Sequence, residues 1–177
     1  MSKPRIIGGS AKGRELQTPA SGTRPSPARL REALFDILAF EPRGRFLDLF
    51  SGSGAVGLEA ASRGWSSVCV ELSRPASEVI RRNASALGLA VEVVTGDAIA
   101  YAQGHTGEFE VVFAAPPYPL DLTELFAAVL AARPVAPGGV YVLQHPSQFV
   151  PAVPEGVTAE EPRIKRYGSN SLTLVRA

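Results

Sequence analysis

The sequence predicts a single α/β domain with a mostly parallel, doubly wound sheet. From residue 46 onward, short apolar runs typical of β-strands alternate with helix-length segments rich in Ala, Leu and Arg. Such alternation is typical of parallel strands joined by crossover helices. A chain of 177 residues, 45% of them hydrophobic, is long enough to bury about two-thirds of its unfolded surface in one core.

Seven strands are expected, five of them parallel. The parallel strands are predicted at residues 46–49, 68–71, 91–94, 111–113 and 140–143. Apolar residues recur near the helical period in three segments between them, at residues 55–63, 74–87 and 121–132. The last two runs, 163–167 and 172–175, flank the turn signal Gly168-Ser169-Asn170, which predicts a closing antiparallel hairpin.

Within this single domain, an N-terminal extension is predicted over residues 1–40, ahead of a core at residues 41–177. It begins with a small hairpin, residues 6–9 and 14–16, around Lys12-Gly13. A Pro-rich loop then leads to a helix over residues 26–39, with Ser26 as its N-cap and Pro27 in its first position. Residues 1–45 hold nine Lys and Arg against four Asp and Glu. This local excess suits either a polyanion or a solvated basic surface.

Several classes of protein are disfavoured by composition. The single cysteine, Cys69, lies in an apolar run, so we expect a buried thiol and neither a disulfide within the chain nor a thiolate metal cluster. His105 and His145 have no partners at metal-ligand spacing, and no metal is predicted. No stretch of eighteen apolar residues occurs and no hydrophobic segment follows Met1, so a soluble, unexported protein is expected.

A glycine-rich loop follows the first predicted strand. Gly52, Gly54 and Gly57 match the spacing G-x-G-x-x-G, which allows a ligand close to the backbone at the carboxyl edge of a sheet. The spacing alone does not distinguish nicotinamide-dependent enzymes from methyltransferases, and a tight turn that binds no ligand can also have it. Asp48 favours the methyl donor, because its carboxylate would repel a pyrophosphate but tolerate the sulfonium and amino group of S-adenosylmethionine.

Acidic residues also follow the second and third predicted strands. Glu71 lies 23 positions after Asp48, where a carboxylate can accept hydrogen bonds from both ribose hydroxyls. Asp97 can accept from an adenine amine while Ala98 offers its N–H, although a helix N-cap at Asp97 is the alternative. The predicted S-adenosylmethionine site therefore comprises Asp48, Phe50, Ser51, Gly52, Gly54, Glu71, Leu72, Asp97 and Ala98.

The loop Ala115-Pro116-Pro117-Tyr118 follows the fourth predicted strand. It resembles motif IV of the amino-methyltransferases, Asp/Asn-Pro-Pro-Tyr. The lone pair of an exocyclic base amine is delocalised, so acceptors must hold the N–H groups and aim the nitrogen at the methyl carbon, while an aromatic ring stacks on the base. The predicted catalytic residues are therefore Ala115, Pro116, Pro117 and Tyr118.

Motifs along nearly the whole chain resemble the bacterial ribosomal RNA guanine-N2 methyltransferases of the RsmD type. They are Arg5-Ile6-Ile7-Gly8-Gly9, Lys12-Gly13-Arg14, Arg24-Pro25, the segment from Arg29 to Leu38, the loop from Asp48 to Gly54, Gly57-Leu58-Glu59-Ala60 and Tyr167-Gly168.

The resemblance implies a Rossmann-like class I methyltransferase fold that uses S-adenosylmethionine, in a cytoplasmic and monomeric protein with no membrane partner. It implies that the substrate is 16S rRNA within an assembled or partly assembled small subunit. RNA contacts are expected from basic side chains of the extension, which are Arg5, Lys12, Arg14, Arg24, Arg29 and Arg31.

The chain departs from the family pattern at one position of motif IV. Ala115 stands where the family has Asp or Asn, and alanine has no side-chain acceptor for the guanine amine. We expect weakened rather than abolished catalysis, because the carbonyl of Pro116 can accept one amine proton. Asp121 offers a carboxylate six residues on, although capping the helix that follows is its other interpretation.

Three alternative functions remain open. A catalytically silent rRNA-binding or assembly factor would retain the fold without the motif IV acceptor. A nicotinamide-dependent oxidoreductase is supported only by the glycine spacing and Glu71. A DNA adenine-N6 methyltransferase shares the logic of motif IV, but this chain has little room for a target-recognition region.

Overall fold

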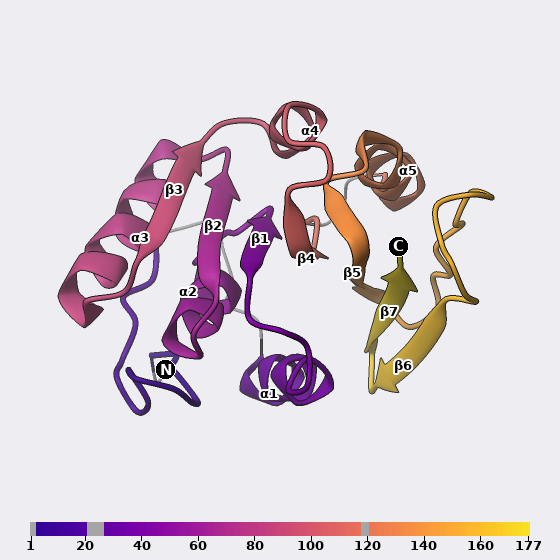
Figure 1. The fold of residues 1–177 in the computed structure, drawn as a ribbon. Coiled ribbons are helices and arrows are strands. Elements are labelled where there is room, and N and C mark those ends of the chain that lie inside the picture. The colour runs from indigo at the N-terminus through magenta and orange to yellow at the C-terminus, as the bar shows by residue number, and fades with distance from the viewer. Residues whose placement is uncertain (1–2, 21–26, 118–120) are drawn as a thin grey trace.

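The computed structural model describes residues 3–20, 27–117 and 121–177, and a single mixed sheet runs through it (Figure 1). Arg24, Ser26 and Tyr118, which the sequence singled out, lie outside the described residues. The strands are β1 Arg45–Leu49, β2 Ser66–Glu71, β3 Val91–Thr95, β4 Phe109–Ala114, β5 Val135–Pro146, β6 Arg163–Tyr167 and β7 Asn170–Arg176. The helices are α1 Ala28–Ile37, α2 Ala55–Ser62, α3 Arg74–Leu87, α4 Ala98–Gln103 and α5 Leu122–Ala132.

The sheet has the strand order β3-β2-β1-β4-β5-β7-β6. Strands β1 to β5 are parallel to one another, β7 is antiparallel to β5, and β6 is antiparallel to β7. Chain order reverses between β1 and β4, which makes the carboxyl edge of these strands the place where open α/β sheets bind ligands. The predicted doubly wound sheet with a closing antiparallel hairpin is confirmed.

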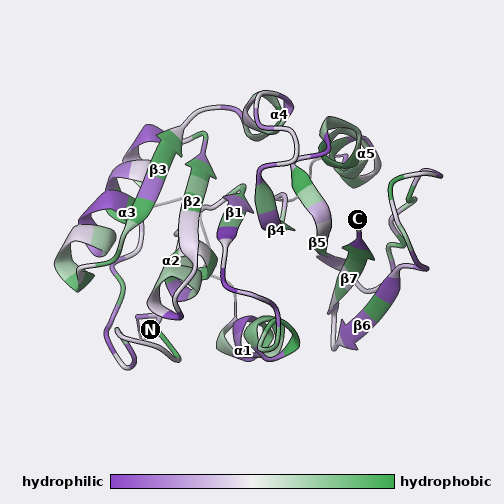
Figure 2. Ribbon diagram, viewed as in Figure 1, coloured by the Kyte–Doolittle hydropathy of each residue, from purple (hydrophilic) through white to green (hydrophobic). Residues whose placement is uncertain are grey.

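Helices cover both faces of the sheet, as the alternation of side chains along each strand requires. Phe46 of β1 faces a cluster built with α1 and α2, whereas its neighbour Leu47 faces a cluster built with α4 and α5. A third cluster joins α2 and α3 to the N-terminal segment and contains the buried thiol of Cys69, whose pKa is raised by burial. Figure 2 shows the apolar strands between these layers and hydrophilic bands on the outer face of α3.

Three local expectations are corrected by the structure. Helix α1 begins at Ala28, and Pro27 is its N-cap rather than its first helical residue. The carbonyl of Pro27 accepts the first helical hydrogen bond, from the N–H of Arg31. Strand β5 begins at Val135 rather than at residue 140 and passes an irregularity in its pairing with β4. The short helix α4 follows Asp97, where the sequence predicts a helix only as the alternative to a ligand contact.

The N-terminal extension packs on α2 and α3 and is tied to them by hydrogen bonds from its backbone to Ser62 and Asn83. The predicted hairpin is reduced to one antiparallel bridge, between Arg5 and Glu15. The N–H groups of Ser10 and Ala11 donate to the carbonyl and hydroxyl of Ser62 at the end of α2. The extension is therefore part of the same core and not a separate arm.

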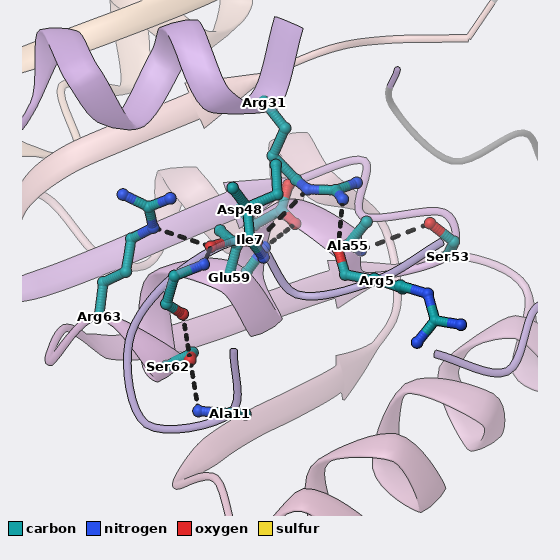
Figure 3. A network of polar contacts seen from close by, with 12 residues as sticks. Arg5, Ile7, Ala11, Arg31, Asp48, Ser53, Ala55, Glu59, Ser62 and Arg63 are labelled. Carbon is teal, nitrogen blue, oxygen red and sulfur yellow. Dashed lines mark hydrogen bonds and ion pairs between the residues drawn. The ribbon is translucent and has the colours of Figure 1, made fainter. Parts of the chain in front are cut away.

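The carboxylate of Glu59 is the centre of this attachment (Figure 3). Glu59 is fully buried, and its two oxygens accept the N–H groups of Ile7 and Gly8 at 2.9 Å each. The guanidinium of Arg63 donates to it at 2.8 Å, and Nε of the buried Arg31 lies 3.5 Å from it. Arg31 also donates to the carbonyl of Arg5 at 2.7 Å, so a charged cluster joins α1, α2 and the extension.

No helix of the described residues is long and apolar enough to cross a membrane.

Replacing Glu59 should strongly destabilise the fold. In the variant Glu59→Gln, the buried cation of Arg31 loses the carboxylate of Glu59, and breaking a buried ion pair in this way typically costs about 3–5 kcal/mol. We expect the free energy of unfolding in urea to fall by that amount. Glu78→Gln, an exposed change on α3, is the matched control and should shift the unfolding free energy by less than about 0.5 kcal/mol. Equal behaviour of the two variants would contradict the central role of Glu59.

Candidate active site

Two loops that the sequence singled out leave the sheet side by side. Leu49, the last residue of β1, pairs with Ala114, the last residue of β4. The glycine loop starts at the residue after Leu49, and the Ala115-Pro116-Pro117 loop starts at the residue after Ala114. The carboxyl edge of the two central strands therefore brings the predicted cofactor loop next to the predicted catalytic loop.

Backbone strain marks the start of the glycine loop. Phe50 has a φ of 57°, a left-handed conformation that residues other than glycine rarely adopt. Such conformations cost roughly 1–3 kcal/mol and are retained mostly at functional sites. The turn is held by the hydroxyl of Ser51, which donates to the carbonyl of Asp48 at 2.7 Å, and by the N–H of Gly54, which donates to the carbonyl of Ser51.

Gly54 is required by conformation and by space, whereas Gly57, in the first turn of α2, is required by space. Gly54, the N-cap of α2, has a φ of 79°, and a Cβ there would lie 2.7 Å from the side chain of Ile80. A Cβ on Gly57 would lie 2.2 Å from the sulfur of Cys69 in β2. These contacts bring α2 against α3 and β2, and the amino end of the helix faces the carboxyl edge of the sheet.

Glu71, at the end of β2, links the loops that follow the first three strands. One carboxylate oxygen accepts the N–H of Gly52 at 2.8 Å and the other accepts the N–H of Ser73 at 2.7 Å. Its backbone carbonyl accepts the N–H of Gly96, in the loop after β3. The next residue, Leu72, is 73% exposed, which places a bare apolar side chain beside a fixed carboxylate at the edge of the sheet.

Asp97 caps α4, because its side chain accepts the N–H of Ala100 at 2.8 Å. The capping alternative is therefore realised. Asp97 is nevertheless exposed at the same edge of the sheet, and the N–H of Ala98 is one of the first-turn donors that a helix leaves without an internal partner. An additional role in holding a ligand stays a prediction.

The catalytic loop carries no acidic side chain in its described part. Ala115 is half-buried and packs against the cluster around α1, Pro116 is buried and Pro117 is exposed. Asp121 caps α5 by accepting the N–H of Glu124 at 3.1 Å. The capping interpretation of Asp121 is therefore the one that the structure supports. Among the described residues, no group of three or more His, Cys, Asp or Glu could hold a metal ion.

The predicted RNA-binding residues differ in their surroundings. Lys12, Arg14 and Arg29 are exposed. Arg5 is partly engaged, because it pairs with Glu15 at 2.7 Å and donates to the carbonyl of Gly13. The prediction for Arg31 is wrong: its side chain is 1% exposed and is held by Glu59, so it cannot reach a phosphate. Burial lowers the pKa of Arg31, and the neighbouring carboxylate of Glu59 opposes that shift.

Glu59 is the residue whose importance the motifs did not reveal. It was noted only as part of the family pattern. A usable signal was present, because Glu59 is the one charged residue in α2, a helix that is otherwise apolar or small. A charge in a helix that is buried all round requires buried partners.

The strand order and the paired loops define the fold of the class I methyltransferases. A structure of a Thermus thermophilus enzyme titled 16S rRNA N2 G1207 methyltransferase, in complex with AdoMet and guanosine, superposes with a TM-score of 0.74 over 99% of this chain and 49% of that one. Its identity is 22%, so this likeness shows the fold alone. A hypothetical protein, also of Thermus thermophilus, is 46% identical and superposes with a TM-score of 0.86, covering 98% and 99% of the two chains.

The chain belongs to the family described as conserved hypothetical protein 95, whose model matches residues 4–176. The ribosomal RNA small subunit methyltransferase D of Escherichia coli K12 is 38% identical over 124 residues, or 68% of this chain. That match spans 63% of the length of the E. coli protein. The family membership confirms the resemblance found in the sequence.

The carboxylate of Asp48 makes stability depend on pH. It is buried behind the glycine loop and accepts the N–H of Gly57 at 3.0 Å. Burial raises its pKa from 3.8 to about 7, against the opposing effect of the Gly57 hydrogen bond. The folded protein therefore holds a proton at pH values where the unfolded chain has lost it. The stability that this proton contributes is fully present below pH 3.8 and is lost as pH rises to about 7.

Comparison with Asp48→Asn should isolate that contribution. The unfolding free energy of the natural protein, minus that of the variant, should fall by roughly 3–5 kcal/mol between about pH 4 and pH 8, at 1.36 kcal/mol per pKa unit. Urea titrations across this range measure both proteins. A difference that stays flat with pH would contradict a buried, protonated Asp48.

Proposed function

We propose that this protein transfers a methyl group from S-adenosylmethionine to the N2 amine of a guanine in 16S rRNA. The observation that carries the proposal is the pairing of Leu49 with Ala114, which sets the glycine loop beside the Pro-Pro loop. Support comes from the methyltransferase fold and from a relative named for methylation of small-subunit rRNA.

The chemistry of the site suits S-adenosylmethionine better than a dinucleotide. The carboxylate of Glu71, at the end of β2, would attract the cationic sulfonium and amino group. Asp48 lies buried near the end of the neighbouring strand, and a bound cation would favour the charged form of its carboxyl group. The fixed carboxylate of Glu71 can accept hydrogen bonds from ribose hydroxyls, and the exposed Leu72 offers an apolar surface for adenine. When bound, S-adenosylmethionine supplies an electrophilic methyl group.

The chain's own part in the reaction is to orient the amine of the target guanine. With S-adenosylmethionine bound, N2 would attack the methyl carbon in line, the electron pair of the carbon–sulfur bond would pass to sulfur to leave S-adenosylhomocysteine, and the proton lost from N2 would pass to solvent. The backbone carbonyl of Pro116 is the acceptor that would hold an N–H of the amine, and Tyr118 is the aromatic residue that would stack on the base. Ala115 provides no second acceptor, so we expect a slower transfer than with Asp or Asn.

A catalytically silent rRNA-binding factor is the second candidate, and Ala115 is the observation that favours it. This alternative keeps cofactor and RNA binding but has no methyl transfer. Only an assay of methyl transfer distinguishes this silent factor from the proposed enzyme.

Weakening the contact to ribose should reduce affinity for the cofactor. In Glu71→Gln, charge-assisted hydrogen bonds become neutral ones, which are roughly half as strong, and the amide NH2 cannot accept one of the two backbone N–H groups of Gly52 and Ser73 that the carboxylate holds. We expect the dissociation constant of S-adenosylmethionine, measured by calorimetry, to rise about tenfold. Glu92→Gln, an exposed change on β3, should leave it unchanged. Unaltered binding by Glu71→Gln would argue against this site.

Restoring the missing acceptor should accelerate methyl transfer. One positioned polar contact in a transition state is worth roughly 3 kcal/mol, or about a hundredfold in rate. We expect Ala115→Asp to label unmodified small-subunit particles faster than the natural protein, up to about a hundredfold, in single-turnover experiments with labelled S-adenosylmethionine. Both should produce N2-methylguanine.

The other outcomes separate the candidates. Cofactor binding by both proteins without labelling of RNA would refute guanine methylation. RNA labelling by Ala115→Asp alone would identify the natural protein as the silent factor.

A further inference from the structure

A groove on the α1 face of the sheet lies outside the site described above. It separates the end of α1 and the residues after it from β5, β7 and β6. Its floor is apolar, and Phe40, at its rim, is 97% exposed, the most exposed large hydrophobic residue of the described part of the chain. Arg163 and Lys165 of β6 line its opposite wall.

The charges of the groove leave cations available for a ligand. Arg176 pairs with Glu41, and both line the groove. Among the described residues, the side chains of Arg163 and Lys165 are in no ion pair or hydrogen bond. Asp36 is the remaining carboxylate of the lining. Two uncommitted cations beside an exposed aromatic ring are the combination that binds single-stranded nucleic acid.

The groove also leads toward the candidate active site. Arg163 and Lys165 pair with Leu174 and Leu172, which pack in the α1 cluster, so they share that face of the sheet. β6 runs parallel to β5 and ends at Tyr167, whose partner Asn170 pairs with Pro146 at the end of β5. Tyr167 and Ala115 pack against the same cluster. An RNA strand that follows β6 along the groove therefore arrives beside the catalytic loop.

We propose that this groove binds single-stranded RNA flanking the target guanine, with Lys165 and Arg163 on phosphates and Phe40 stacked on a base. The inference rests on the proposed function and adds a second RNA-contacting surface to the basic extension. The phosphates meet the cations of β6, and the base covers the otherwise bare ring of Phe40.

Basic residues on β6 have a competing explanation, because β6 is the edge strand of the sheet and Lys and Arg protect open edges from pairing with other chains. The structure provides a matched control for this explanation. Arg166 lies on the same strand but pairs with Ser171, so its side chain is on the opposite face from Lys165. Edge protection would involve both residues, whereas groove binding involves only Lys165.

The test is equilibrium binding of S-adenosylmethionine-loaded protein to unmodified small-subunit particles over a range of salt concentrations. For Lys165→Gln we expect weaker binding and a slope of log affinity against log salt that is smaller by about 0.7, the value for one phosphate contact on a single strand. For Phe40→Ala we expect at least about a fivefold loss of affinity with an unchanged slope, because stacking is not an ionic contact. Phe40→Trp should retain the affinity.

Arg166→Gln should bind as the natural protein does, and cofactor affinity should be unchanged in all four variants. Equal losses in Lys165→Gln and Arg166→Gln, or no loss in Lys165→Gln and Phe40→Ala, would overturn the groove proposal while leaving the methyltransferase proposal intact. No binding of RNA by the natural protein would overturn both.

A photoreactive benzophenone side chain at position 40 identifies the occupant directly. We expect its cross-links in the particle to be with RNA. Cross-links exclusively to ribosomal protein would show a protein-binding groove and refute the proposal.

Discussion

The carboxylate of Glu59 is the interaction on which the arrangement of the whole amino-terminal half depends. An ionised carboxylate with no exposure to water is expensive unless every lone pair has a partner. Here the partners come from three separate segments: two backbone N–H groups of the extension, Arg31 of α1 and Arg63 at the end of α2. Each segment provides a hydrogen-bond or ion-pair partner for a polar group that packing of the other segments has buried. Detaching any one of them would therefore leave a charged group in the core without that partner.

This cluster also fixes the position of the basic side chains of the extension that we propose bind RNA. The extension has few strand contacts of its own, since one isolated bridge joins Arg5 to Glu15. Its shape comes from the core on which it packs. The exposed cations of the extension, Lys12 and Arg14, are therefore carried by a segment that is fixed relative to the sheet. Cations held at fixed positions lose less conformational entropy when they bind phosphates than cations on a free arm would.

Much of the fold could be predicted because strands, crossover helices and the last hairpin depend on patterns within short segments. What could not be predicted depends on partners distant in sequence. On a helical wheel Arg31 lies at the edge of the apolar face of α1, and its burial is explained only when Glu59, 28 positions on, is known to lie against it. Gly57 was identified by spacing, but the reason for it, contact with Cys69, appears only when α2 packs on β2. The strain at Phe50 has no sequence signature, because its surroundings determine it. The glycine loop and the Pro-Pro loop are adjacent because β1 and β4 are neighbours in the sheet. The order of the strands along the chain does not show which strands are neighbours in the sheet.

Charge is separated across this molecule in a way that suits two oppositely charged ligands. The carboxylate of Glu71 and the buried Asp48 lie at the carboxyl edge near the centre of the sheet, where the proposed cofactor would bring a cation that favours the charged form of Asp48. Uncommitted Lys and Arg side chains lie on the extension and on β6. A carboxylate at position 115 would lie between these regions, close to where RNA and cofactor meet. In the proposed reaction, its absence would remove an acceptor from the target amine, and it would also remove a negative charge from the proposed path of the RNA. Loss of the acceptor should therefore affect the chemical step more than the binding of either ligand, because the contacts that attract each ligand lie elsewhere.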